Sequence, residues 1–195
     1  LPLPPSPSPR ARGEGRGEGN PQCTMSNGPI KLFIGLPIYS QVPAFFLQSL
    51  LALQARKPLF AADGREIKIT IGMSQGDGVA RSRNQLSADF LASDCTHLLF
   101  IDCDLIFSAE HVARIVSHDA PLVGGLYPKK QDVPGLPEWV LNSLPDTEPD
   151  ENGLQEVRYI GTGFMCIQRL TFELMLLHYR PQIEFTADYG KRRQE

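Results

Sequence analysis

The stretch HLLFIDCD, residues 97–104, decides the class of fold. Its apolar residues follow one another without alternation, which is the pattern of a parallel strand covered on both faces. Two acids come directly after this run, Asp102 and Asp104. Side chains two residues apart in an extended chain project to the same side, so we expect both carboxylates at one place where the strand ends.

Similar apolar runs surround this stretch. Four of them predict strands: residues 30–36, 66–73, 122–126 and 157–167. Pro37 is expected to close the first, because proline cannot donate to a strand ladder. Helices are predicted over residues 79–92 and 170–177, and Ser108 is expected to cap another that begins after the two acids. This alternation predicts an α/β fold, a mostly parallel central sheet flanked by helices.

Composition predicts one domain with an extension before it. Residues 1–29 are rich in Pro, Ser, Gly and Arg and predict a disordered segment, whereas residues 30–195 predict a single domain. A net charge of -3 with mixed signs gives no basic stripe for nucleic acid. No apolar run is long enough to span a membrane, no signal peptide is recognisable, and the cysteines show no metal-binding spacing. These features favour a soluble protein of the reducing cytoplasm.

The loops after several predicted strands carry polar or aromatic residues. Pro37 and Tyr39 follow the first strand, Asp77 follows the second, and Tyr127 and Lys129 follow the fourth. Ligands of open α/β sheets bind outside the carboxyl ends of the strands, so these loops are expected to meet Asp102 and Asp104 in one crevice. Taken alone, an Asp-x-Asp pattern is more often a chance feature of a solvated loop, and its place at the end of a predicted strand is what favours a site.

Arg83 is predicted to face inward from the first turn of the helix over residues 79–92. At 100° per residue it falls in the same arc as Leu86 and Phe90. A buried guanidinium needs an anion, which is either a ligand or a structural partner such as Asp77 or Asp89.

Two carboxylates held close together repel each other unless a cation lies between them or one is protonated. Oxygen ligands suit Mn²⁺ or Mg²⁺, and such metals are commonly shared with substrate phosphates. We therefore expect a metal at Asp102 and Asp104. Gly161 and Gly163 are interpreted as positions where the backbone approaches a substrate closely.

Four pieces of the chain together resemble the family 2 glycosyltransferases and their relatives with the GT-A fold, a Rossmann-like fold of nucleotide-diphospho-sugar transferases. The matching pieces are IGLPIYS at 34–40, ARSRN at 80–84, LLFIDCD at 98–104 and GTGFMCIQR at 161–169. The resemblance implies a UDP- or GDP-sugar donor, with Pro37 and Tyr39 near the base, Arg83 and Asn84 near the nucleotide, Asp102 near the ribose or metal, and Asp104 as direct metal ligand. Asp77, Lys129, Gly161 and Gly163 complete the candidate nucleotide-sugar-binding set.

The sequence departs from that family at the catalytic base, which the relatives supply from an acidic pair after the strand that here holds residues 161–168. Asp188 before Tyr189 is only a partial match, and the expectation is a domain truncated at its C-terminus or one without catalysis. The leading hypothesis is a hexosyltransferase-like glycosyltransferase, inverting if it follows the family, that acts on an unknown acceptor hydroxyl. A non-catalytic nucleotide-sugar-binding domain and a nucleotidyltransferase are the alternatives.

Overall fold

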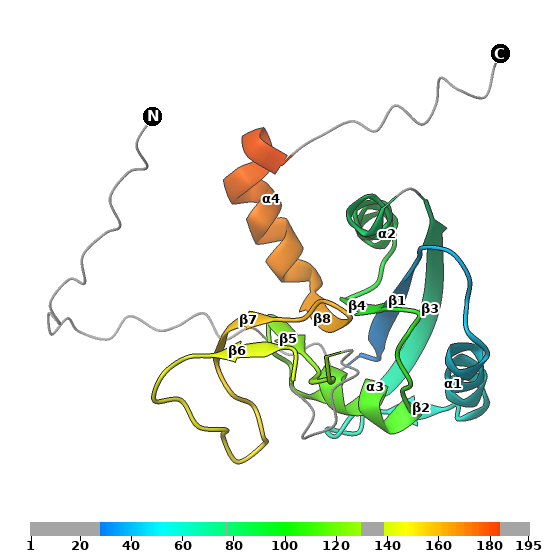
Figure 1. The fold of residues 1–195 in the computed structure, drawn as a ribbon, viewed down its shortest axis with the longest axis horizontal. Coiled ribbons are helices and arrows are strands. Elements are labelled where there is room, and N and C mark those ends of the chain that lie inside the picture. Colours follow the sequence, from blue (N-terminus) through cyan, green and yellow to red (C-terminus); the bar gives the residue numbers. More distant parts are fainter. Residues whose placement is uncertain (1–27, 77, 130–138, 184–195) are drawn as a thin grey trace, which may run out of the picture.

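A computed structural model describes residues 28–76, 78–129 and 139–183 of the chain. Its main sheet has six strands in the order β2-β3-β1-β4-β8-β5, and β6 pairs with β7 in a second, small sheet (Figure 1). The strands are β1 (Ile30–Ile38), β2 (Leu59–Phe60), β3 (Glu66–Gln75), β4 (His97–Ile101), β5 (Leu122–Gly124), β6 (Leu141–Ser143), β7 (Val157–Ile160) and β8 (Phe164–Gln168). The helices are α1 (Ala44–Ala55), α2 (Val79–Ala92), α3 (Ala109–Ser117) and α4 (Arg169–Ile183).

The α/β class is confirmed, but the sheet is mixed, so the prediction of a mostly parallel sheet is not confirmed. β1 pairs in parallel with β3 and with β4, whereas β8 runs antiparallel to both β4 and β5. The run at residues 157–167 forms two strands of different sheets, because the chain turns between β7 and β8. The apolar composition of β8 marks it as buried but does not encode its direction.

β4 is the most enclosed strand, and all five of its residues are buried. Leu99 and Ile101 belong to the core cluster that also contains Phe46 of α1 and Val112 of α3. Leu98 and Phe100 belong to a second cluster, formed with α2 and β8. The alternation of a strand therefore distributes β4 between two cores, one on each face of the sheet.

β1 continues through Pro37 to Ile38, so the expectation that Pro37 ends the strand is wrong. β4 pairs with β1 only as far as Gly35, and beyond that point only β3 lies beside β1. A proline is tolerated there because one edge of the strand is open.

The helices begin where local signals are strong. α2 has the bounds predicted for it, and α3 begins after Ser108, whose hydroxyl accepts a hydrogen bond from the His111 N–H. α4 is joined to the end of α2 through Arg169, whose guanidinium donates to the carbonyls of Cys95 (2.7 Å) and Ser93 (2.8 Å). These contacts fix the start of α4 against the sheet, and the rest of the helix extends away from the sheet (Figure 1).

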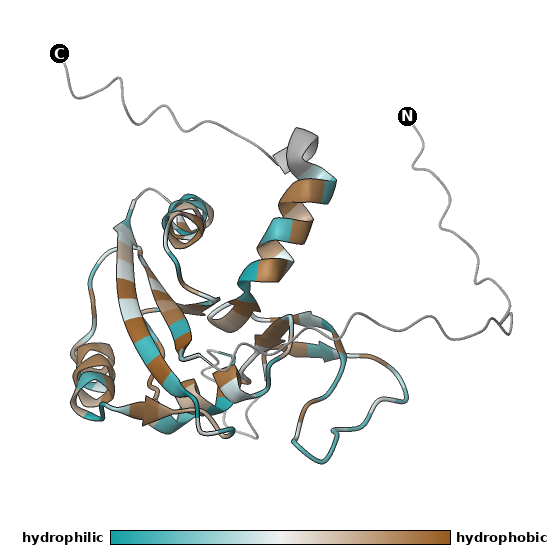
Figure 2. Ribbon diagram, turned by 180° about the vertical axis from the view of Figure 1, so that it is seen from behind, coloured by the Kyte–Doolittle hydropathy of each residue, from teal (hydrophilic) through white to brown (hydrophobic). Residues whose placement is uncertain are grey.

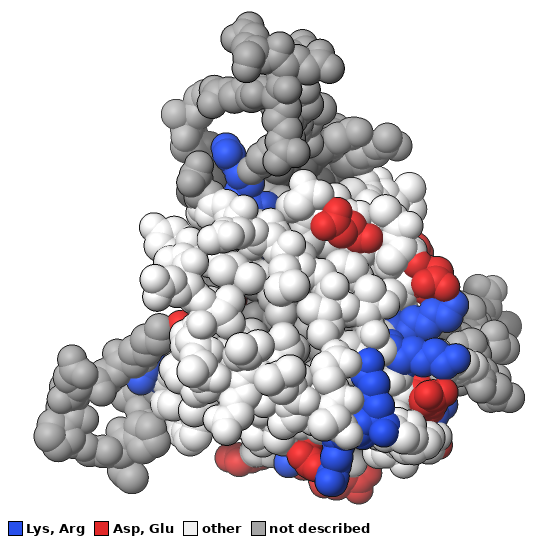
Figure 3. Space-filling view, turned by 90° about the vertical axis from the view of Figure 1, so that its right-hand side faces the viewer, with Lys and Arg blue, Asp and Glu red and all other residues white. Residues whose placement is uncertain are grey.

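Polar and apolar surfaces are distributed unevenly. β3 alternates in hydropathy along its length (Figure 2), in keeping with the inward position of Ile67. The face of the molecule in Figure 3 is uncharged over its centre, and its charged residues lie around the rim, most of them at the right and bottom. α1 has exposed apolar side chains, including Leu47 and Leu51. No helix in the described part of the chain is long and apolar enough to cross a membrane.

Candidate functional site

The segment after β4 is a turn. β4 ends at Ile101, and the Leu105 N–H donates to the Asp102 carbonyl over 3.2 Å, so residues 102–105 are not extended. The reason for expecting both carboxylates on one side was therefore wrong. Nevertheless, Asp102 and Asp104 line the same pocket, because the turn places them both at its edge.

Arg83 faces inward, as predicted, and its anionic partner is Asp102. Its Nη2 lies 2.6 Å from Asp102 Oδ1, and its Nη1 donates to Thr162 Oγ1 over 2.5 Å. The guanidinium carbon also lies 5.7 Å from the centre of the Phe100 ring. Of the two partners considered from the sequence, Asp89 accepts instead from Gln85, and Asp77 lies outside the described residues.

This ion pair orients the Asp102 carboxylate. The Arg83 and Asp102 side chains are 19% and 33% exposed, so water screens their attraction only in part. Arg83 offsets the charge of Asp102 and holds its carboxylate in one orientation. Asp104 is exposed at the pocket edge, which leaves it better placed to meet a metal ion.

The structure explains why glycine occupies both ends of the GTG segment, residues 161–163, which sequence analysis missed. The Gly163 N–H donates to Tyr127 Oη over 3.0 Å, and the Asp102 N–H donates to the Gly163 carbonyl over 2.8 Å. A Cβ at Gly163 would lie 2.8 Å from Tyr127 Oη and 3.0 Å from Asp102 Oδ2, and one at Gly161 would overlap Tyr127 Oη. Glycine is needed at both positions so that Tyr127 can sit against the chain. Their contact with a substrate remains a prediction.

The pocket itself has a volume of about 1130 Å³. Its walls come from the turn after β4, from α3, from β5 with the segment that follows it, and from the region around Val140 and Leu154. Lys129 lines it, as expected from its position after the fourth predicted strand. α3 contributes His111 and Arg114, and the residue that caps its C-terminus is His118; sequence analysis missed all three. Their spacing of three and four residues on one helix was the available signal.

Other predicted residues do not meet there. Pro37 is buried in β1, Tyr39 is 71% exposed, and Asn84 is exposed on α2; none of them lines the pocket. Asp188, the weak candidate for a catalytic base, lies outside the described residues. Thr162 is a further residue that sequence analysis missed, and its position between two glycines was the only sign of a special role.

A metal held by protein ligands alone does not fit the described part of the chain. Among those residues, no three His, Cys, Asp or Glu side chains are grouped closely enough to hold one. Mg²⁺ and Mn²⁺ can also be held by one or two carboxylates together with water and substrate phosphates, so a metal at Asp102 and Asp104 stays a prediction.

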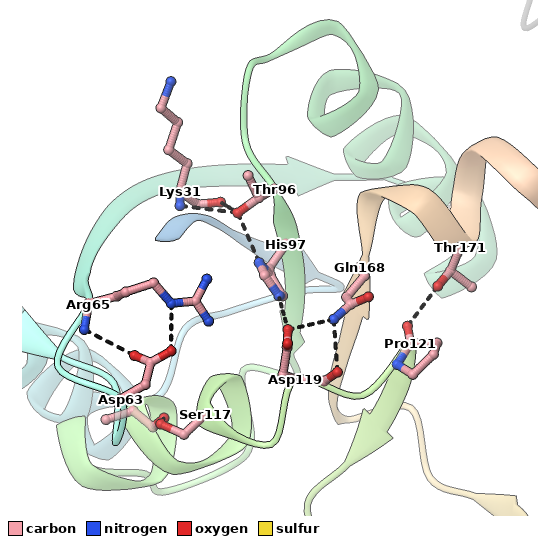
Figure 4. Close-up of polar contacts among 11 residues, drawn as sticks. Lys31, Asp63, Arg65, Thr96, His97, Ser117, Asp119, Pro121, Gln168 and Thr171 are labelled. Carbon is pink, nitrogen blue, oxygen red and sulfur yellow. Dashed lines mark hydrogen bonds and ion pairs between the residues drawn. The ribbon is translucent and has the colours of Figure 1, made fainter. Parts of the chain in front are cut away.

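The opposite end of β4 holds a second polar group, which lies outside this site (Figure 4). His97 is buried, with Nδ1 2.9 Å from Thr96 Oγ1 and Nε2 4.0 Å from Asp119 Oδ1. Burial lowers the pKa of His97, and the Asp119 carboxylate partly opposes that shift. Gln168 donates to the same Asp119 carboxylate over 2.8 Å, which ties β8 to the loop after α3.

Comparisons with known proteins identify no family. No protein-family model matches the sequence, and no curated protein matches it. Among solved structures, A197 from STIV is similar with a TM-score of 0.46 and 21% identity, over 81% of this chain and 70% of that chain. The 4-diphosphocytidyl-2C-methyl-D-erythritol synthase from Anaerococcus prevotii DSM 20548 is similar with a TM-score of 0.41 and 12% identity, over 83% of this chain and 81% of that chain. At these scores, neither likeness identifies a function for this chain.

Proposed function

We propose that this chain binds a nucleoside diphosphate-sugar through a divalent metal at Asp102 and Asp104, as the donor site of a glycosyltransferase. The observation that carries the proposal is the position of both acids at the edge of a pocket of about 1130 Å³. Such a volume exceeds what a metal ion alone requires and suits a ligand of the size of a nucleotide-sugar.

The two acids are assigned different roles. Asp102 is oriented by Arg83 at 2.6 Å, so we assign it to hold the ribose or to assist at the metal. Asp104 is assigned as the direct metal ligand because it is exposed at the pocket edge. When bound, Mn²⁺ or Mg²⁺ would offset the charge that develops on the departing diphosphate. Since no three potential metal ligands are grouped among the described residues, metal and diphosphate are expected to bind together.

One observation favours binding without catalysis as the second candidate. Asp102 and Asp104 are the only carboxylates among the described residues that line the pocket. Transfer to an acceptor hydroxyl needs a group that takes its proton, and if both acids serve the donor and metal, only the histidines of the described pocket, His111 and His118, remain for this role.

Calorimetry with UDP and GDP, with and without Mn²⁺, tests the shared metal. We expect at least one nucleotide to bind at least tenfold (~1.4 kcal/mol) more tightly with Mn²⁺. Asp104→Asn is expected to abolish this gain. Asp89→Asn is the matched control, because Asp89 is exposed on α2 and does not line the pocket, and the gain should persist in it. Equal binding with and without metal in the wild-type chain would refute the proposal.

Product analysis separates the activities. Release of UDP or GDP from a donor sugar would support the transferase, and metal-dependent binding without turnover would support the binding domain. Release of pyrophosphate from a nucleoside triphosphate and a sugar phosphate would instead support the nucleotidyltransferase, which would use the same acids and metal.

A further inference from the structure

The wall that α3 gives to the pocket is basic. His111 and Arg114 of α3 and His118, its C-cap residue, follow one another at intervals of three and four residues, so they lie toward one side of the helix. All three line the pocket, while Val112 and Val116 of the same helix are buried in the core. One side of α3 therefore anchors the helix and an adjacent side presents nitrogen donors to the pocket.

Arg114 has no ion pair within the described part of the chain. The loop opposite approaches it closely, since a Cβ at Gly153 would lie 3.2 Å from Arg114 Nη2. Gly153 has a φ of +77°, a conformation that residues with side chains rarely adopt. The loop backbone thus confines the guanidinium but provides no carboxylate for it.

His111 adds a donor beside Arg114. Its Nδ1 accepts a hydrogen bond from the Ser108 N–H over 3.3 Å, as part of the cap of α3. In the neutral ring the proton then resides on Nε2, which is left as a hydrogen-bond donor. The cap therefore selects the tautomer of His111 that can bind an acceptor.

The geometry of its donors suits this wall to anions. Arg114 and His111 are exposed, so water screens their attraction to an anion in part. Val123 and Leu154, which line the pocket beside α3, are half-buried. Arg114 matches the planar, two-oxygen edge of a carboxylate or two oxygens of a phosphate.

We infer that Arg114, with His111 and His118, forms an anion subsite that binds a carboxylate or phosphate on the sugar or acceptor. The identity of that ligand as a sugar or its acceptor rests on the proposed function. The pocket would then distinguish acidic from neutral sugars, with its acidic residues holding the metal and α3 holding the substrate anion.

Three small probes that share one ring test the subsite in the full chain without nucleotide or metal: glucose, glucuronate and glucose 6-phosphate. Amide and side-chain NMR titrations give the dissociation constant of each. We expect at least one of the two anions to bind at least about tenfold more tightly than glucose. Which of the two binds more tightly distinguishes a carboxylate ligand from a phosphate ligand.

Variants then assign the effect to Arg114. Arg114→Gln is expected to remove the preference for the anion, and Arg114→Lys to retain part of it. Arg158→Gln is the matched control, because Arg158 is exposed on β7 and does not line the pocket. This variant should bind the three probes with the dissociation constants of the wild-type chain.

The inference is overturned if neither anion binds more tightly than glucose, including the case in which none of the probes binds. It is also overturned if Arg158→Gln weakens the binding of the anion as much as Arg114→Gln does. Because these titrations contain no metal or nucleotide, they can fail while the manganese-dependent binding of UDP or GDP remains intact. Failure of the subsite is therefore distinguishable from failure of the donor site.

Discussion

The ion pair between Arg83 and Asp102 is expected to stabilise the fold measurably. Arg83→Met keeps much of the length of the side chain but removes the charged hydrogen bonds to Asp102 Oδ1 (2.6 Å) and Thr162 Oγ1 (2.5 Å). The variant would leave Asp102 without its cation at the end of the central strand β4.

The size of the effect follows from exposure. A hydrogen bond to a charged group contributes roughly 1.5–3 kcal/mol, and breaking a fully buried pair costs more. Asp102 is 33% exposed, so water can rehydrate it and the low end of that range applies. We expect Arg83→Met to lower the free energy of unfolding by about 2 kcal/mol. A double-mutant cycle with Asp102→Asn should give a coupling of about 1–2 kcal/mol.

Urea unfolding followed by circular dichroism measures all four proteins of the cycle. With a denaturant slope of about 2 kcal/mol per molar, Arg83→Met should move the midpoint down by about 1 M. Arg158→Met, which changes an exposed arginine of β7, is the control and should leave the midpoint nearly unchanged. A coupling below about 0.5 kcal/mol would contradict the assignment of Asp102 as the main partner of Arg83.

Two further predictions concern buried titratable groups. Because burial lowers the pKa of His97 while Asp119 opposes and Arg65 adds to the shift, protonation favours the unfolded chain. The contribution of His97 to stability is therefore complete above pH 6.5 and decreases as the pH falls below that value. Thermal unfolding between pH 5 and 8 should show a melting temperature that falls toward low pH. This pH dependence should be weaker in His97→Gln and unchanged in the control His178→Gln. Burial also raises the pKa of Cys166 to about 12, so this thiol should not react while the chain is folded. Iodoacetamide at pH 8 should alkylate the half-buried Cys103 and should modify Cys166 only after unfolding. Peptide mass spectrometry measures both modifications. Alkylation of native Cys166 at the rate of Cys103 would contradict this second prediction.

Local patterns in the sequence predicted most of the longer elements in their order and several of their details, but not β2, β6 or the division between β7 and β8. An unbroken apolar run identified β4 as a covered strand, and helical periodicity showed that Arg83 faces inward. Ser108 was recognisable as a cap because capping depends on neighbours within one turn. Each of these features is decided within a few residues of the chain, so the sequence alone determines it.

Tertiary structure decided how distant segments pair and what the site contains. β8 runs antiparallel to β4, and the turn between β7 and β8 brings Thr162 to Arg83, which lies 79 residues earlier in the chain. Tyr127 packs against the GTG segment, and this contact requires glycine at positions 161 and 163. The spacing of residues in the sequence does not reveal such a contact. The sequence by itself determined that Asp102 and Asp104 follow a buried strand. Only the fold decided that Arg83 pairs with Asp102 and that α3 lines the same pocket as both acids, because such contacts depend on strand direction and side-chain packing rather than on local periodicity.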